Sequence, residues 1–254
     1  MAGLRVLLVA VLCVCLGAAI LVAEGCSKPT SDTGTVAPPA KSPSGASKAQ
    51  PAETKTQSAK GTTESAGATA TPELKIGTTL ENLQAAFDGE SNAHARYLEF
   101  AKKADEEGYK QVALLFRAAA RSEEIHARNH EAAITKLGGA AKADVKPADV
   151  KSTKENLEAA VKGETYEMKT MYPKFLEVAR ADKSADAIKS LNGAMKAEAE
   201  HAKLYKEALD NLDAWKTIAI DLYVCPVCGY TTKTLDFAKC PVCSTDASKF
   251  EKIK

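Results

Sequence analysis

Two short phrases in the middle of this chain pair a carboxylate with an imidazole. Glu123 and His126 lie three residues apart, and Glu198 and His201 repeat that spacing. Both phrases lie in sequence typical of helices, where side chains three residues apart stand on one face, one above the other. A metal ion can bind such a pair. A single phrase is weak evidence, because glutamate is a good helix former and is usually a solvated surface charge.

A glutamate precedes each phrase, and this duplication strengthens the signal. Gly89-Glu90 comes before the first phrase and Gly163-Glu164 before the second. The order is therefore Glu, Glu-x-x-His, Glu, Glu-x-x-His, with one part for each expected helix. This set is the known ligand pattern of ferritin-like di-iron carboxylate proteins, in which all parts project into the core of a helical bundle. Four separate coincidences at matching places would otherwise be needed.

Four cysteines near the end of the chain form a second candidate metal site. Cys225 with Cys228, and Cys240 with Cys243, make two Cys-x-x-Cys knuckles. Each knuckle can direct two thiolates at one ion, and together they make a closed tetrahedral site with four sulfur ligands. The spacing allows zinc or iron, and by itself it favours a structural zinc ribbon. A pair of disulfides is the weaker interpretation, since matched knuckles suit a metal better.

Apolar residues at helical spacing predict four helices that position the first set of ligands. They lie within residues 72–107, 109–137, 153–181 and 184–212. Glu90 falls on the apolar stripe of the first helix, and it needs a partner there because burying an unpaired carboxylate is costly. We expect Pro173 to kink the third helix. The two pairs of helices repeat one pattern, as duplicated hairpins would.

The connection at 138–152 is long and polar, with Pro147 in its middle. Helix connections in bundles usually take about 2–8 residues, so this segment is expected to be the single crossover of a ferritin-like topology. Low aromatic content with much alanine, lysine and glutamate also favours helices. The expected fold is mainly α: a ferritin-like four-helix bundle at 72–214, followed by a small metal-knuckle domain at 221–254.

Residues 1–26 indicate export. Arg5 gives a short positive start, and residues 6–23 are almost unbroken apolar sequence. The Ala-Glu-Gly-Cys phrase at 23–26 resembles a bacterial lipobox, in which cleavage leaves a lipidated Cys26, although Glu24 departs from that pattern. The alternative is an uncleaved anchor, since about 18 apolar residues can just span a bilayer. Both interpretations place the rest of the chain outside the cytoplasmic membrane and attached to it, in the periplasm or cell envelope.

Residues 27–71 are expected to be a disordered tether. They consist largely of Ser, Thr, Ala, Pro, Gly and Lys, with almost no large apolar residue. Such a segment cannot bury enough surface to offset its ordering entropy. The whole chain of 254 residues has a formal net charge of +1. This charge is nearly balanced, so it gives no reason to expect a nucleic-acid partner.

Taken together, residues 72–254 resemble the rubrerythrin family of non-haem di-iron peroxidases. The matching motifs are Gly89-Glu90-Ser91 with Tyr97, Glu123 with His126, Gly-Glu-Thr-Tyr-Glu at 163–167 followed by Met171-Tyr172-Pro173, and Glu198 with His201. The Cys-Pro-x-Cys-Gly-Tyr phrase at 225–230 resembles rubredoxin. This likeness raises mononuclear iron above zinc for the tail.

The resemblance implies a role for each ligand of a centre with two irons. Glu123 and Glu198 would bridge the irons. Glu90 and His126 would serve one iron, and Glu164 and His201 would serve the other.

Three further residues need an interpretation. Glu167 is implied to exchange with the histidine as a ligand when the irons change oxidation state. Tyr97 and Tyr172 match family tyrosines near the cluster, and we assign the catalytic roles to Glu167 and Tyr97; core packing explains the tyrosines equally well. His94 departs from the family motif and is expected to be a hydrogen-bonded core histidine, outside the ligand set.

The implied function is reduction of hydrogen peroxide to water in defence against oxidative stress. Two ferrous ions about 3.5–4 Å apart can bind both oxygens of a peroxide and deliver two electrons together. The tail iron would then refill the site one electron at a time. The resemblance also implies a homodimer, in which the tail of one subunit lies beside the bundle of its partner.

The electron donor would be an extracytoplasmic one that the sequence does not identify, because a nicotinamide-linked reductase would not reach an exported protein. Two other classes of function stay open. One is a ferroxidase or iron-handling protein that uses the same bundle. The other is a non-catalytic metal-binding protein with a zinc knuckle.

Overall fold

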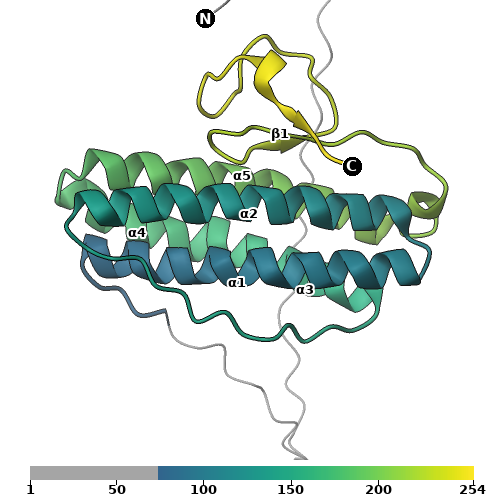
Figure 1. Ribbon diagram of the computed structural model, residues 1–254, viewed down its shortest axis with the longest axis horizontal. Coiled ribbons are helices and arrows are strands. Elements are labelled where there is room, and N and C mark those ends of the chain that lie inside the picture. Colours follow the sequence, from purple (N-terminus) through teal and green to yellow (C-terminus); the bar gives the residue numbers. More distant parts are fainter. Residues whose placement is uncertain (1–73) are drawn as a thin grey trace, which may run out of the picture. The chain divides into compact units, whose positions relative to one another are not determined.

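The computed structural model describes residues 74–254; the expected export segment at 1–26 and tether at 27–71 lie outside the described residues. Four helical rods form a bundle (Figure 1). They are α1 (Thr79–Glu106), α2 (Lys110–Lys136), a third rod made of α3 (Thr153–Tyr166), the π-helical turn η1 (Glu167–Met171) and α4 (Tyr172–Ala181), and finally α5 (Ala185–Asp210). The expected mainly α fold is confirmed. Among these residues, no helix combines the length and the apolar character that crossing a bilayer requires.

Both helix hairpins begin with the same capping device. Thr78 Oγ1 accepts a hydrogen bond from the backbone N–H of Glu81, whose carboxylate accepts one from the N–H of Thr78. Ser152 and Glu155 repeat this arrangement at the start of α3. Each reciprocal pair satisfies two backbone donors that would otherwise be unpaired. The repeat is what a duplicated hairpin predicts.

The third rod contains one wide turn where we expected a kink. The N–H of Tyr172 bonds to the carbonyl of Glu167, five residues earlier, which is the π-helical pattern. Pro173 follows directly, in the first turn of α4, where a missing N–H is tolerated. The rod therefore continues past the proline. Wide turns of this kind are frequent at functional sites, because one extra residue changes which side chains face the core.

The crossover at 138–152 lies along α1, held through its backbone. Gln84 bonds both to the carbonyl and to the N–H of Lys142. One turn further along α1, Asp88 accepts from the N–H of Asp144 at 2.6 Å. The next turn brings Asn92, which accepts from the N–H of residue 146 and donates to the carbonyl of residue 144. The two spacings match, because four helical residues rise about 6 Å, as do two extended residues.

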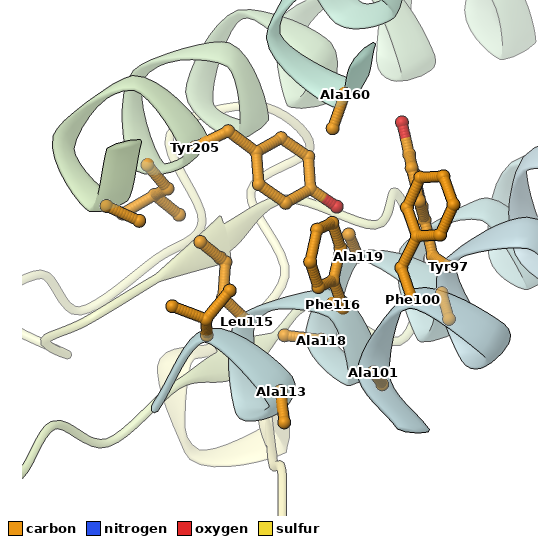
Figure 2. Close-up of a cluster of buried hydrophobic side chains, with 14 of the residues drawn as sticks. Tyr97, Phe100, Ala101, Ala113, Leu115, Phe116, Ala118, Ala119, Ala160 and Tyr205 are labelled. Atoms are coloured by element: carbon orange, nitrogen blue, oxygen red, sulfur yellow. The ribbon is translucent and has the colours of Figure 1, made fainter. Parts of the chain in front are cut away.

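Two apolar clusters fill the bundle on either side of the buried carboxylates. The first is built around Tyr97, Phe100, Phe116 and Tyr205, whose ring centroids lie 5.2–6.1 Å apart. Figure 2 shows these rings with alanines at the helix contacts around them. Small residues let the helices approach, while each buried ring contributes about 2–3 kcal/mol. The second cluster, which includes Phe175, fills the part formed by α4 and the start of α5.

The tail after α5 forms a small three-stranded antiparallel sheet. Its elements are the 3₁₀ turn η2 (Ala214–Lys216), β1 (Tyr223–Val224), β2 (Thr231–Thr232), the 3₁₀ turn η3 (Ala247–Lys249) and β3 (Glu251–Lys252), with strand order β2-β1-β3. The tail lies against α2 and α5 (Figure 1). Arg121 of α2 holds Glu251 through two N–H groups, at 2.8 and 2.9 Å. Lys233 of the tail reaches Glu207 of α5 at 2.6 Å.

Candidate metal centres

Six side chains from all four rods converge at the centre of the bundle. They form two overlapping groups, one of Glu90, Glu123, His126 and Glu198, and the other of Glu123, Glu164, Glu198 and His201. All are buried. Only Glu123 and Glu198 belong to both groups, and these are the positions from which a carboxylate can bridge two ions. The six glutamates and histidines that the resemblance implies as ligands of the two irons therefore lie together, and Glu167 lies outside both groups.

Each histidine directs the same nitrogen at the carboxylates. Nδ1 of His126 lies 2.8 Å from Glu123 and 2.9 Å from Glu198. Nδ1 of His201 lies 2.8 Å from Glu198. Nε2 of His126 faces the carbonyl oxygen of Cys228 at 3.1 Å. Because a carbonyl only accepts, Nε2 carries a proton, and with a metal bound Nδ1 would offer its lone pair to that metal.

Several polar atoms of this cluster make no hydrogen bond of good geometry within residues 74–254, although the oxygens of Glu198 lie close to the two histidine Nδ1 atoms. The atoms are Oε2 of Glu90, Oε1 of Glu123, Oε2 of Glu164 and both oxygens of Glu198, together with Nδ1 of His201. Buried polar atoms are rarely left unpaired. Of the eight such orphaned atoms among the described residues, six belong to the expected ligands, and the other two are Oγ1 of Thr153 and the hydroxyl of Tyr205; this concentration is what ion-binding atoms would show. Hard carboxylate oxygens with imidazole suit iron, so the donor set fits two iron ions.

Charge within the cluster shifts the pKa values in opposite directions. Burial raises the pKa of Glu90 and of Glu164, and their carboxylate neighbours raise both further. Burial would also raise the pKa of Glu198, but His126 and His201 lower it to about 2. Burial would lower the pKa of His201, but Glu123 and Glu198 raise it to about 10. So many carboxylates stay ionised together only beside positive charge, which bound metal ions supply.

Two tyrosines hold the outer carboxylates. Tyr97 donates its hydroxyl proton to Oε1 of Glu164, and Tyr172 donates to Oε1 of Glu90. In each glutamate, Oε2 is the orphaned oxygen. The tyrosines therefore occupy one oxygen and leave the other for a metal. Their placement beside the cluster agrees with the expected positions.

Glu167 lies at the start of η1, outside both groups of converging atoms. Burial raises its pKa, and Glu164 raises it further. His94 also stands apart, since its Nδ1 lies 2.7 Å from the carbonyl of Ala120. His94 is thus hydrogen-bonded as we expected, but it is half-buried and does not lie in the core.

The four tail cysteines converge as two pairs. The Sγ atoms of Cys225 and Cys243 lie 3.6 Å apart, as do those of Cys228 and Cys240. A disulfide would bring two sulfurs to about 2 Å. A tetrahedral ion with sulfur at about 2.3 Å would place them about 3.8 Å apart. The tail is therefore built for a metal ion.

The tail also bonds directly to the ligand-bearing helices, which spacing did not predict. Ser122 Oγ donates to the carbonyl of Gly229 at 2.6 Å. Nε2 of His201 lies 3.0 Å from Thr231 Oγ1, which donates to the same carbonyl. Gly229 has φ +77°, and a Cβ there would overlap Nε2 of His126 and Oγ of Ser122. Two more residues were missed, His130 and Ser190, although His130 stands one helical turn after His126 on the same face.

The fold and the two sites define a ferritin-like di-iron carboxylate bundle joined to a four-cysteine domain. Comparison with known families gives the same division. Residues 81–209 match the Rubrerythrin family, and residues 223–251 match the family described as "Rubrerythrin, rubredoxin-like domain".

Individual relatives span most of the described chain. Rubrerythrin-2 of Clostridium acetobutylicum is 39% identical over 186 residues, which are 70% of this chain and 98% of that protein. Nigerythrin of Nitratidesulfovibrio vulgaris is 40% identical over 165 residues, or 65% of this chain and 81% of that protein. A mixed-valence structure of nigerythrin superposes with a TM-score of 0.67 at 37% identity, covering 71% of this chain and 88% of that one.

This chain therefore belongs to the rubrerythrin family. The carboxylate and histidine ligands are those of a di-iron centre, and the four cysteines are those of a mononuclear iron site.

Proposed function

We propose that this protein is a peroxidase that reduces hydrogen peroxide to water in defence against oxidative stress. Membership of an oxidoreductase family supports the class of reaction. The reaction breaks the O–O bond and takes two electrons and two protons to give two water molecules. When bound, a pair of ferrous ions supplies both electrons together.

The observation that carries this proposal is the hydrogen bond between His126 and the carbonyl of Cys228. Cys228 is a candidate ligand of the tail iron, and His126 is a candidate ligand of the di-iron centre. One side chain, one carbonyl and one hydrogen bond thus connect the two sites. A structural zinc site does not need a bonded path to the di-iron centre, whereas an electron-transfer centre does.

The protein's own residues prepare the site for this chemistry. Tyr97 and Tyr172 hold the outer carboxylates by donated hydrogen bonds, so each glutamate presents one defined oxygen. Glu167, in the wide turn η1, is proposed to exchange with the histidine as a ligand, as the family resemblance implies. The π-helical turn supports this role because such turns are frequent at functional sites.

The experiment is stopped-flow reoxidation of the anaerobically reduced protein by hydrogen peroxide and, separately, by O₂. We expect the visible absorbance of the ferric thiolate site to return with one peroxide for every two electrons, and faster than with O₂. Reaction with O₂ alone, with ferric iron accumulating, would identify a ferroxidase instead. As-isolated protein without ferric thiolate absorbance would indicate a zinc knuckle and overturn the electron-transfer scheme.

We further propose that the protein acts as a homodimer outside the cytoplasmic membrane, where an extracytoplasmic donor reduces the tail iron. The location rests on the lipobox-like phrase ending at Cys26, and the dimer rests on the family resemblance. Acylation of a processed N-terminus would give stable anchoring. Cys26→Ala is then expected to release the protein from the membrane fraction. Continued tight association would favour an uncleaved anchor.

A further inference from the structure

His130 is a fully buried histidine that does not belong to either group of candidate ligands. It lies on α2 one turn after His126, and both of its ring nitrogens are bonded. Nδ1 lies 2.8 Å from Ser190 Oγ, and Nε2 lies 3.1 Å from the hydroxyl of Tyr172. Tyr172 in turn bonds to Glu90. Ser190, His130 and Tyr172 therefore form an unbroken chain from α5 to a ligand of the di-iron centre.

The direction of these hydrogen bonds follows from the last acceptor. A metal-bound Glu90 is ionised and only accepts, so the single hydroxyl proton of Tyr172 points to it. The Tyr172 oxygen must then accept from Nε2–H of His130. On the other side of the ring, Nδ1 faces the hydroxyl of Ser190, which donates its proton to this nitrogen. Every bond in the chain is thus donated toward Glu90.

The two outer glutamates differ in this support. Tyr97 donates to Glu164 in the same way, but its ring lies among Phe100, Phe116 and Tyr205 (Figure 2). Within residues 74–254, no histidine bonds to the Tyr97 hydroxyl. On the Glu164 side the Arg96 guanidinium lies 5.3 Å from the centroid of the Tyr97 ring, whereas His130 and Ser190 form the second tier of polar groups behind Glu90. That tier ends at Ser190, which lines a cleft of about 400 Å³ that also borders the Cys228 knuckle.

We propose that His130 is a positioning residue of the di-iron centre. With Ser190 it fixes Tyr172 as a donor to Oε1 of Glu90, and so makes Oε2 the metal-binding oxygen. The role rests on the di-iron site within the proposed function but not on peroxide as the substrate. Removing a group that orients a metal ligand typically costs about 10–100-fold in affinity, and here the cost should fall on one of the two metal positions.

The test is a titration of metal-free, full-length protein with Co²⁺. The visible absorption bands of Co²⁺ in the bundle sites measure the binding. Tyr172→Phe and His130→Leu should each weaken one of the two bundle equivalents by about tenfold or more. Because His130 acts through Tyr172, the double variant should be no weaker than Tyr172→Phe alone. Losses that add in the double variant would overturn the proposal.

Control variants separate positioning from general damage. His94→Gln changes a histidine contact between α1 and α2 that lies outside the cluster, and it should leave both bundle affinities unchanged. Tyr97→Phe should weaken the other bundle equivalent. His130→Gln should recover part of the lost affinity, because its amide can donate to Tyr172. The Co²⁺–thiolate absorption bands of the four-cysteine site show whether the tail is intact in each variant.

A readout independent of metal affinity covers the case in which His130→Leu does not fold. In ¹⁵N NMR spectra of the unsubstituted, zinc-loaded protein, His130 should show a protonated Nε2 and an unprotonated Nδ1. Ser190→Ala should shift the Nδ1 resonance. The opposite tautomer, or a doubly protonated ring, would contradict the proposed direction of the chain.

Discussion

Nε2 of His126 and the carbonyl oxygen of Cys228 lie 3.1 Å apart, although the two residues are 102 positions apart in the sequence. This hydrogen bond fixes the tautomer of His126, a ligand of the di-iron centre. Its acceptor belongs to the tail, which carries the separate four-cysteine iron site. From the family resemblance we expected a partner subunit's tail at this face. In this single chain, the chain's own tail occupies that face.

Gly229→Ala should disturb this contact while leaving the four cysteines in place. The new Cβ would overlap Ser122 and His126, at a φ of +77° that disfavours side chains. We expect the ferric thiolate spectrum to persist and reoxidation of the tail iron by peroxide to slow by about tenfold or more. Stopped-flow absorbance measures both quantities.

Gly193→Ala is the matched control for that variant. A Cβ at Gly193 would lie 3.8 Å from Cys228 Cβ, an ordinary contact, and alanine favours the α5 helix. Its reoxidation rate should equal that of the unsubstituted protein. Equal rates in both variants would show that the seating of Gly229 is irrelevant to electron transfer.

Glu123→Ala and Glu198→Ala should each abolish the di-iron centre and leave the tail metal bound. Each glutamate belongs to both converging groups, and its removal leaves two cations facing each other without a bridge. Metal analysis should fall from three irons per chain to about one. Glu124→Ala, an exposed neighbour paired with Arg121, should retain all three. Two bundle irons in either bridging variant would disprove the assignment.

Mixing two inactive variants tests which tail serves which bundle. Glu123→Ala lacks a working bundle, and Cys228→Ser lacks a working tail. If a partner subunit's tail serves the bundle, as the family resemblance implies, peroxidase activity should partly return once mass-tagged subunits have been shown to exchange. Activity that stays at background would show that each bundle uses its own tail, which bonds to His126 in this chain.

Glu107 should make a pH-dependent contribution to stability. Its carboxylate accepts a hydrogen bond from the N–H of Thr153 at 2.9 Å, which lowers the pKa of Glu107 and ties the end of α1 to the start of α3. A carboxyl whose folded pKa is lowered stabilises the fold above its unfolded pKa, about 4.3. That stability is lost as the pH falls through the folded value.

Glu107→Gln should therefore lower the free energy of unfolding by about 1 kcal/mol or less at pH 7. The difference from the unsubstituted protein should shrink as the pH falls below 4.3. Calorimetric unfolding at several pH values measures it. Glu106→Gln, the exposed neighbour, should show no comparable effect, and a pH-independent difference at Glu107 would rule out the charge as its cause.

The ligands could be predicted because their information is local. In a helix, Glu-x-x-His spacing alone brings Glu123 and His126 to one face, and the duplicated order supplies the rest. The capping phrase at Thr78 and Glu81 likewise marks where α1 begins, several residues after the start of the expected segment at 72. Local sequence could not show the wide turn at η1, since a π-helical turn depends on the register that surrounding helices impose.

Contacts between residues far apart in the sequence could not be predicted from it. His130 meets Ser190 across 60 positions and Tyr172 across 42, and each of these residues alone has an ordinary alternative in a helical core. The seating of Gly229 on α2 is equally invisible in sequence, because a glycine after a Cys-x-x-Cys knuckle already has a local explanation in its positive φ. Only the packed structure shows that the same glycine also makes room for His126.

The way in which the crossover at 138–152 is held limits which sequence changes this segment can tolerate. Gln84, Asp88 and Asn92 recognise backbone groups of the crossover, not its side chains. The specificity of docking is therefore encoded in α1, and the exposed side chains of the crossover carry little of it. Substitutions there should be nearly neutral, while insertion of a single residue would break the match between two extended residues and one helical turn. Relatives with this crossover should conserve its length more strictly than its composition.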